Sequence, residues 1–300
     1  MDFMLNLSSV FKTASSVSVN ASELKVNLHF IDACNAHCRG CFATEFPGED
    51  HFMSLENAHK TIINLCAAGV ARFNLAGGEP TIHPHFAEIC KFIHDRGCSV
   101  SVITNGSRLS AEFLDRVGPY LETIGLSIDS FDYDTSVRLG RFTGSARNPK
   151  YFGFNELSAL VPKIRSYGIN LKINTVISNQ NCEEIMADRI RELGVDRWKI
   201  IKMSPYNVGG HSNLDLIPTE EEYQHFVERN SYEHSVIETD MKNTYLVIDP
   251  NGNLLDNSNT AAEENSGYRV VGSFLRENAV QILKRYFAIF NLTAYRERYL

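Results

Sequence analysis

Short β-prone runs alternate with longer amphipathic stretches along most of this 300-residue chain. The pattern predicts strands at residues 25–31, 72–76, 99–104, 123–129, 170–177 and 197–203. The stretches between them predict helices at 55–68, 84–96, 111–120, 156–167 and 182–193. Repeated strand–helix units with right-handed crossovers build a parallel α/β sheet, which either fans open or curls into a barrel.

Several element ends are readable. Pro84 suits a first helical position, and the pairs Asn181/Glu184 and Thr219/Glu222 have capping-box spacing. After residue 203 the alternation stops. The remaining pattern predicts a helix at 219–229, a strand at 244–248, a hairpin turn at 249–252 and a last helix at 280–290. We therefore predict an N-terminal arm (1–24), a strand–helix domain (25–204) and a C-terminal extension (205–300).

The net negative charge of the chain limits which molecules it can bind through long-range attraction. A net charge of -7 gives no long-range attraction for a phosphodiester backbone or an anionic membrane, so we expect neither nucleic acid nor a membrane as partner. No apolar run approaches the ~20 residues needed to cross a bilayer, and the first 20 residues lack a signal-peptide pattern. The sequence predicts a soluble, cytoplasmic protein, in which the seven cysteines are ligands or buried apolar residues.

The predicted strands have one polar and one apolar face. Because side chains alternate along a strand, each polar pair shares a face: Asn27/His29, Arg72/Asn74, Ser127/Asp129, Lys172/Asn174 and Arg197/Lys199. Helices between parallel strands usually cover both faces of a sheet. We therefore interpret the polar face as the lining of a wet, ligand-sized cavity. The alternative is a half-buried sheet whose polar face meets solvent.

Three cysteines stand together where the first strand ends. Cys34, Cys38 and Cys41 form a C-x3-C-x2-C run, and three thiolates in one short loop suit an iron–sulfur cluster. A zinc site needs a fourth ligand, for which His37 is a candidate. The other cysteines fall in predicted core positions: Cys66, Cys90, Cys98 and Cys182. Three ligands imply a cluster with one iron open to an exogenous ligand.

This cysteine run resembles that of the radical S-adenosylmethionine (SAM) superfamily. The resemblance implies a partial (β/α)6 barrel, of the TIM type, over residues 25–204, with the extension closing the substrate pocket. It also implies a [4Fe-4S] cluster whose open iron binds SAM, and release of a 5'-deoxyadenosyl radical. The superfamily usually has an aromatic residue before the third cysteine, whereas this chain has Gly40 there and Phe42 after it.

A second superfamily element follows the second strand, in the run Gly77-Gly78-Glu79-Pro80. Paired glycines allow close approach to a ligand because no Cβ intervenes. The run lies at the carboxyl end of a strand, where such folds bind ligands. By resemblance, the SAM-binding residues are Gly77, Gly78, Glu79, Asn105, Ser127 and Arg141.

Residues 25–249 further resemble the viperin family of nucleotide-modifying radical enzymes. The matching segments are Asn27–Phe30, Phe73–Pro80, Asp129–Asp132, Leu139–Arg141, Lys172–Ile177, Arg197–Lys199 and Tyr245–Asp249. The resemblance implies removal of the 4'-hydrogen of a ribonucleoside triphosphate (CTP, UTP or GTP) and loss of its 3'-hydroxyl. The 3'-deoxy-3',4'-didehydro product of the family terminates viral RNA chains. Tyr245 matches a family tyrosine near the ribose, and flavodoxin or ferredoxin is an expected electron donor.

The polar face independently offers a place for a triphosphate. An acidic protein must hold about four negative charges with a local group of cations. The predicted substrate-binding residues are Arg72, Asn74, Lys172, Asn174, Arg197 and Lys199. Unpaired cations inside a barrel are costly, which favours a bound anion over four separately solvated charges.

Two alternatives remain. One is another radical SAM enzyme, such as a GTP cyclase or a peptide modifier, although those commonly carry further C-terminal cysteines and this chain has none after Cys182. The other is a non-catalytic scaffold braced by a metal cluster. The last fifty residues resemble the animal viperins little, and residues 1–24 show no basic amphipathic helix of the animal type. The preferred nucleobase is therefore not predicted.

Overall fold

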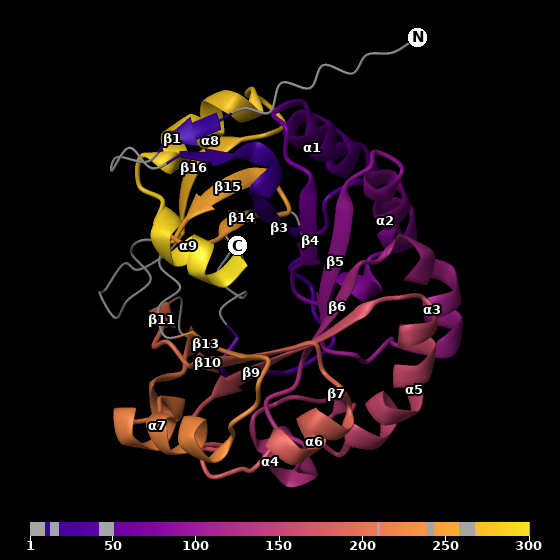
Figure 1. The fold of residues 1–300 in the computed structure, drawn as a ribbon, viewed down its shortest axis with the longest axis vertical. Helices are drawn as coiled ribbons and strands as arrows, with labels where there is room; N and C mark the ends of the chain where they lie inside the picture. The colour runs from indigo at the N-terminus through magenta and orange to yellow at the C-terminus, as the bar shows by residue number, and fades with distance from the viewer. Residues whose placement is uncertain are drawn as a thin grey trace.

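A curled ten-stranded sheet dominates the computed structural model, which describes residues 10–12, 18–41, 51–208, 211–238, 243–257 and 268–299 (Figure 1). The strand order is β13-β10-β9-β6-β5-β4-β3-β14-β15-β16. Its central six strands are parallel, with bounds β3 Lys25–His29, β4 Arg72–Ala76, β5 Ser99–Thr104, β6 Thr123–Ser127, β9 Asn170–Ile177 and β10 Arg197–Lys202. These are the six predicted strands, three of them one or two residues shorter than predicted.

Helices cover the outer face of this sheet (Figure 1). They are α1 Leu55–Ala67, α2 Phe86–His94, α3 Ala111–Val117, α4 Tyr133–Arg138, α5 Phe154–Ser166 and α6 Ala187–Glu192. Under them lie the apolar side chains of the strands, among which Leu28, Phe73, Leu126 and Leu171 have no exposed surface. The predicted apolar face is therefore the core, which leaves the polar face on the inside of the curled sheet.

The C-terminal region continues the same sheet at both edges. α7 Glu220–Arg229 leads to β13 Ser235–Glu238, which pairs in parallel with β10. On the other side, β14 Leu246–Ile248 pairs in parallel with β3. The strands β15 Asn253–Asp256 and β16 Arg269–Ser273 follow in antiparallel order, and the turn at 249–252 makes the predicted hairpin. Eight neighbouring strands are thus parallel.

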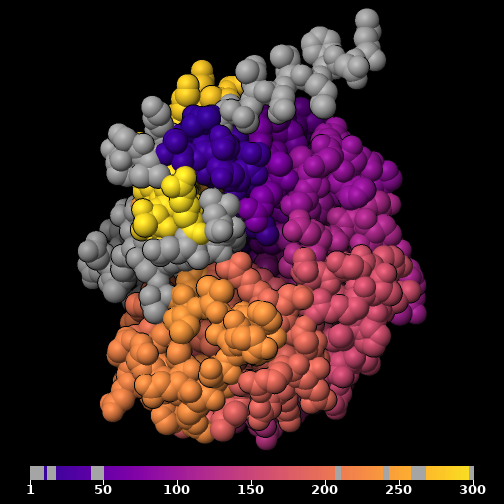
Figure 2. All heavy atoms as spheres, in the orientation of Figure 1, coloured from indigo at the N-terminus to yellow at the C-terminus, as the bar shows by residue number. Residues whose placement is uncertain are grey.

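The two ends of the chain pack together (Figure 2). The N-terminal hairpin β1 Val10–Lys12/β2 Ser18–Asn20 meets α8 Ala279–Phe287 where the rings of Phe11 and Phe287 stack at 5.1 Å. The last helix, α9 Leu292–Tyr299, carries the buried Tyr295. Its hydroxyl accepts from the Lys25 amide at 2.6 Å and donates to the Glu23 carbonyl at 3.0 Å. These contacts place α9 at the amino end of β3.

Three predicted helix starts are wrong: α5 begins at Phe154, two residues before the predicted start, and α2 and α6 begin later than predicted. Pro84 lies in a turn, and α2 begins at Phe86 because His85 occupies the N-cap position. Asn181 does not cap a helix: its side-chain oxygen accepts from the Ser178 amide at 2.7 Å and closes a local turn, so α6 begins only at Ala187. The capping box of Thr219 with Glu222 is confirmed at the start of α7.

The pattern did not predict α4, α9, β13 and β16, so the helix expected as the last one, at 280–290, is α8, which ends at Phe287 and is followed by α9. Smaller elements that it also did not predict complete the fold. They are the hairpins β7 Thr143–Ser145/β8 Asn148–Lys150 and β11 Asn207–Val208/β12 His211–Ser212, and 3-10 turns at Ala21–Glu23, Pro80–Ile82, Gly118–Tyr120 and Leu214–Leu216. Within the described ranges, no helix has the length and apolarity needed to span a membrane.

Candidate active site

The cysteine loop lies at the carboxyl end of β3 and is braced by the segment that follows α4. The His37 amide donates to the Gly140 carbonyl, and the Arg39 amide donates to the Leu139 carbonyl, both at 3.1 Å. Gly140 has a φ of +74°, and a Cβ there would lie 2.0 Å from the His37 carbonyl oxygen. The loop that carries Cys34, Cys38 and Cys41 therefore depends on a glycine that allows the two backbones to touch.

The three thiols are free of disulfides, and N–H groups donate to the sulfurs of Cys34 and Cys38. The Ala36 amide donates to the Cys34 sulfur, and Arg141 Nη1 donates to the Cys38 sulfur, both at 3.4 Å. Donors of this kind stabilise thiolates and tune iron–sulfur clusters. The soft donor set suits the chemistry of a cluster, whereas within the described residues no three such side chains converge as a ready metal-binding group. The fourth zinc ligand considered from the sequence, His37, has its Nε2 3.0 Å from the Gly144 carbonyl oxygen.

The Gly-Gly-Glu-Pro turn packs directly against the backbone of the cysteine loop. A Cβ on Gly77 would lie 2.0 Å from the Ile31 carbonyl oxygen, and one on Gly78 would lie 2.2 Å from that of Ala33. The Gly78 amide also donates to the Ile31 carbonyl at 2.7 Å. The close approach that the sequence predicts is therefore made to the chain before Cys34.

Glu79 links this turn to the end of β5. Its carboxylate is 1% exposed and accepts hydrogen bonds from Thr81, from the Thr104 hydroxyl at 2.6 Å and from the Asn105 amide at 2.7 Å. Burial raises the pKa of this carboxyl. Its visible role is to position the 104–107 loop, in which Asn105 Nδ2 donates to Asn35 Oδ1 at 2.9 Å.

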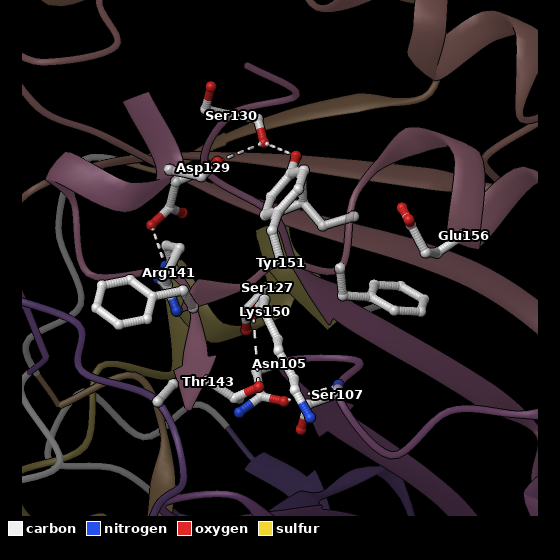
Figure 3. A pocket seen from close by; sticks show the side chains of 15 residues that line it. Asn105, Ser107, Ser127, Asp129, Ser130, Arg141, Thr143, Lys150, Tyr151 and Glu156 are labelled. Atoms are coloured by element: carbon white, nitrogen blue, oxygen red, sulfur yellow. Dashed lines mark hydrogen bonds and ion pairs between the residues drawn. The ribbon is translucent and has the colours of Figure 1, made fainter. Parts of the chain in front are cut away.

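A cavity of about 250 Å³ lies beside the cysteine loop (Figure 3). It brings together three of the predicted SAM-binding residues, Asn105, Ser127 and Arg141. Arg141 forms an ion pair with Asp129, which fixes the guanidinium at the wall of the cavity and beside Cys38. Sequence reasoning missed the opposite wall, formed by Lys150, Tyr151, Phe152 and Glu156. Figure 3 shows the Lys150 side chain extended toward Asn105 and Ser107.

Deeper in the curled sheet, near the amino ends of the strands, four cations influence one another. Arg197 is level with Lys172, and Arg72 is level with Lys25, a residue that the sequence analysis did not select. Burial, with repulsion from Arg197 and Lys25, lowers the pKa of Lys172 to about 7. Burial also lowers the pKa of Lys25 to about 8, with Arg72 as the next cause. Among the described residues, no carboxylate forms an ion pair with Lys25, Arg72 or Lys172.

Amides line the same inner face. The Ser101 hydroxyl donates to Asn74 Oδ1 at 2.9 Å, and Asn74 Nδ2 donates to Asn27 Oδ1 at 2.8 Å. Asn27 Nδ2 and Asn174 Oδ1 are buried and have no hydrogen-bond partner within the described part of the chain. Because an unsatisfied buried polar atom costs about 1–3 kcal/mol, these atoms indicate a place for a polar ligand.

Lys199 and Tyr245 meet a residue that the sequence analysis missed, Glu238. Lys199 from β10 pairs with Glu238 at the end of β13, and both contact the hydroxyl of Tyr245, which directly precedes β14. The Glu238 side chain is fully buried. Since β13 and β14 flank opposite ends of the parallel array, this trio joins its two sides. The only sequence signal for Glu238 is the short β-prone run 235–238, which was not predicted as a strand.

Comparison with known proteins places this fold and loop in a class. Residues 28–186 match the model of the Radical SAM superfamily. Among solved structures, Streptococcus suis SuiB bound to its precursor peptide SuiA aligns with a TM-score of 0.66 at 14% identity, over 88% of this chain and 65% of SuiB. Another structure of SuiB contains bound SAM, with a TM-score of 0.60. The chain is a radical SAM protein, and the predicted partial barrel and the two cofactors, a [4Fe-4S] cluster and SAM, are confirmed.

Sequence relatives narrow the class. An S-adenosylmethionine-dependent nucleotide dehydratase of Selenomonas ruminantium is 34% identical over 282 residues, which cover 92% of this chain and 98% of that protein. One of Flammeovirga pacifica is also 34% identical, over 81% of this chain and 86% of its own length. The chain belongs to this nucleotide dehydratase family, the viperins, as the sequence motifs predict.

Proposed function

We propose that this protein is a radical SAM lyase that dehydrates a ribonucleoside triphosphate, CTP, UTP or GTP, to its 3'-deoxy-3',4'-didehydro analogue. The observation that carries the proposal is a group of half-buried cations, Lys25, Arg72 and Lys172, in which desolvation lowers the pKa values of both lysines, inside a protein of net charge -7. Within the described ranges none of the three forms an ion pair with a carboxylate, although Glu122 attracts Lys25 from a distance and Arg72 donates to the Glu23 carbonyl at 3.3 Å. Poorly compensated cations are costly in such a setting unless a polyanion binds them. The names of the relatives support a nucleotide as that polyanion.

The cofactor residues divide into ligands and supports. Cys34, Cys38 and Cys41 would hold the cluster, and SAM would lie in the adjacent cavity against Asn105, Ser127 and Arg141. When bound and supplied with one electron, for which flavodoxin or ferredoxin is the proposed donor, these cofactors provide the 5'-deoxyadenosyl radical. Gly77, Gly78 and Glu79 support the site through the cysteine loop and the 104–107 loop.

The inner face would hold the nucleotide. Arg72, Lys172 and Arg197, with Lys25, would bind the phosphates, and Asn74 and Asn174 the sugar or base oxygens. Lys199 lies two residues beyond Arg197 in β10, and its ammonium contacts the hydroxyl of Tyr245, which directly precedes β14 and is level with Lys25. At this contact the two side chains would face the ribose. Tyr245 is the proposed source of the last electron and proton. A buried setting excludes water from the radical. The product, a chain terminator of RNA synthesis, gives the proposed antiviral role.

An anaerobic assay tests the proposal. Reconstituted protein is supplied with dithionite, SAM and each of CTP, UTP, GTP and ATP, and 5'-deoxyadenosine and nucleotide products are measured by mass spectrometry. We expect one nucleotide to raise 5'-deoxyadenosine at least tenfold and to lose the mass of water. Cys38→Ala should abolish SAM cleavage, whereas the control Cys90→Ala, at a buried thiol outside the loop, should keep it. No nucleotide-dependent 5'-deoxyadenosine from the wild-type protein would contradict the proposal.

A further inference from the structure

The carboxylate of Glu238 offsets the charge of Lys199, so the trio of Lys199, Glu238 and Tyr245 carries less positive charge than the sequence predicts. A clamp for a polyanion carries excess positive charge, but the buried carboxylate of Glu238 already pairs with the Lys199 ammonium. The Lys199 and Glu238 side chains are 7% and 0% exposed, so water screens this pair little. The trio is therefore formally neutral, unlike the deeper cations. This argues against Lys199 as a simple phosphate ligand.

The trio spans two levels of the sheet: Tyr245 directly precedes β14 and is level with Lys25, whereas Lys199 lies beyond the deep cations of its own strand. Lys199 lies two residues beyond Arg197 in β10 and is level with Asn174. Two residues of a strand span roughly 7 Å toward the carboxyl end, the end that carries the cysteine loop. A nucleotide whose phosphates contact Arg197 and Lys172 would thus have its ribose beside the Lys199 ammonium, where the Tyr245 hydroxyl also lies.

The hydrogen bonds inside the trio have a direction. The Lys199 ammonium donates to the Tyr245 hydroxyl oxygen, and that hydroxyl donates to Glu238 Oε1. Lys199 also contacts the second oxygen of the same carboxylate, and its ammonium lies 4.8 Å from the Tyr245 ring centroid. A phenol whose proton already points at a carboxylate loses an electron more easily, because the proton can leave with it.

We propose that Glu238 is a positioning residue that couples proton movement to the oxidation of Tyr245 during loss of the ribose 3'-hydroxyl; this rests on the proposed function. The nucleotide that has lost its 4'-hydrogen breaks its C3'–O bond, and the hydroxyl takes a proton from the Lys199 ammonium and leaves as water. Tyr245 gives one electron to complete the C3'=C4' double bond, and its phenolic proton passes to Glu238. Glu238 then returns a proton to the neutral Lys199 amine.

The proposed reaction steps balance in atoms and electrons. Nucleotide and trio together lose only water, Lys199 and Glu238 regain their charges, and Tyr245 is left as a neutral phenoxyl radical. A one-electron reductant of the flavodoxin or ferredoxin class and a solvent proton restore the phenol. Lys199, Tyr245 and the nucleotide exchange charge directly, whereas Glu238 acts through its two neighbours.

Glu238→Gln tests the proposal because it keeps the size and removes the base. We expect the cluster-free variant to bind the nucleotide within about twofold of wild type by calorimetry. The reconstituted variant should still cleave SAM when the nucleotide is added, but its yield of didehydro product per 5'-deoxyadenosine should fall at least tenfold. Glu238→Asp should recover part of that yield. The matched control is Asp256→Asn, at a buried carboxylate of β15 that pairs with Arg269. A product yield in Glu238→Gln equal to that of wild type would overturn the proposal.

A second measurement needs no cofactor. Tyrosines labelled with 13C at the ring ζ carbon are titrated by NMR in the cluster-free protein, and Tyr245→Phe identifies the Tyr245 signal. Removing the neighbouring carboxylate should lower the pKa of the Tyr245 phenol in Glu238→Gln, and an unchanged titration would refute the coupling. If wild type forms no nucleotide product, the proposed function fails, while this titration still decides whether Glu238 controls Tyr245.

Discussion

Lys172 shows how one residue connects burial, charge and ligand affinity. Its pKa of about 7 means that the amine is only half charged near neutral pH. A bound polyanion favours the ammonium, so binding takes up a proton when the pH lies above 7. Nucleotide affinity is therefore greatest at a pH below the pKa that Lys172 has in the nucleotide-free protein, and it falls as the pH rises through that pKa.

This gives a testable pH dependence. Between pH 7.5 and 9, nucleotide affinity of the cluster-free protein should fall about tenfold, with proton uptake visible by calorimetry in buffers of different ionisation enthalpy. Lys172→Arg keeps its charge and should flatten the profile, leaving the smaller dependence of Lys25, whose pKa is about 8. An equally steep profile in Lys172→Arg would show that other groups titrate.

The same residue is expected to reduce stability. A buried lysine with a lowered pKa destabilises the folded state when it is charged, and the loss diminishes as the pH rises from 7 toward 10.5. Lys172→Met should therefore raise the free energy of unfolding at pH 7 by about 2 kcal/mol while it weakens nucleotide binding. Chemical denaturation measures the free energy of unfolding, and calorimetry on the same samples measures nucleotide binding. A variant that is less stable than wild type contradicts the argument.

Much at this scale was predictable from the sequence. Strand periodicity placed Arg72, Lys172 and Arg197 on one inner face, and the structure keeps them there. It could not predict which cations have partners, because the carboxylate that pairs with Lys199 comes from a strand 39 positions away in sequence. Lys25 was missed although it lies two residues before Asn27 in the predicted strand 25–31 and therefore shares the polar face.

Among the elements, the turn after β4 supports the cysteine loop. Gly78→Ala would place a Cβ 2.2 Å from the Ala33 carbonyl oxygen, so the two backbones must separate. We expect a loss of stability above about 2 kcal/mol and less iron per protein after reconstitution. Gly97→Ala is the matched control, since its φ is +72° but nothing lies within 4 Å of the new Cβ; about 1 kcal/mol and normal iron are expected. Equal effects of the two substitutions would remove the special role of the turn.

Element prediction succeeded where local pattern and tertiary contact agree. β4, β5 and β9 match their predicted bounds because each is a β-prone run flanked by glycines or turns. The start of α6 was predicted too early because Asn181 satisfies backbone groups in a turn as readily as at a helix end. β13 and β16 are short, and only pairing with a distant neighbour makes them strands.

At the scale of the whole molecule, the curled sheet combines an acidic protein with a cationic interior. The repeated units predicted a parallel α/β sheet and the superfamily resemblance predicted a partial barrel, but neither predicted that β13 and β14 would bring Glu238 and Tyr245 together across it. Contacts of that kind depend on the final curvature of the sheet, which no local pattern encodes.

The position of α9 has a kinetic consequence. Tyr295 fastens this helix over the amino end of β3, so a nucleotide whose phosphates lie deepest would arrive from the end where SAM binds. The nucleotide should therefore load first, and 5'-deoxyadenosine and methionine should depart before it. Initial-rate studies should show compulsory order, with SAM inhibiting by forming a dead-end complex when it is added first. Random order of binding would mean that the nucleotide can also enter the site by a route that SAM does not block.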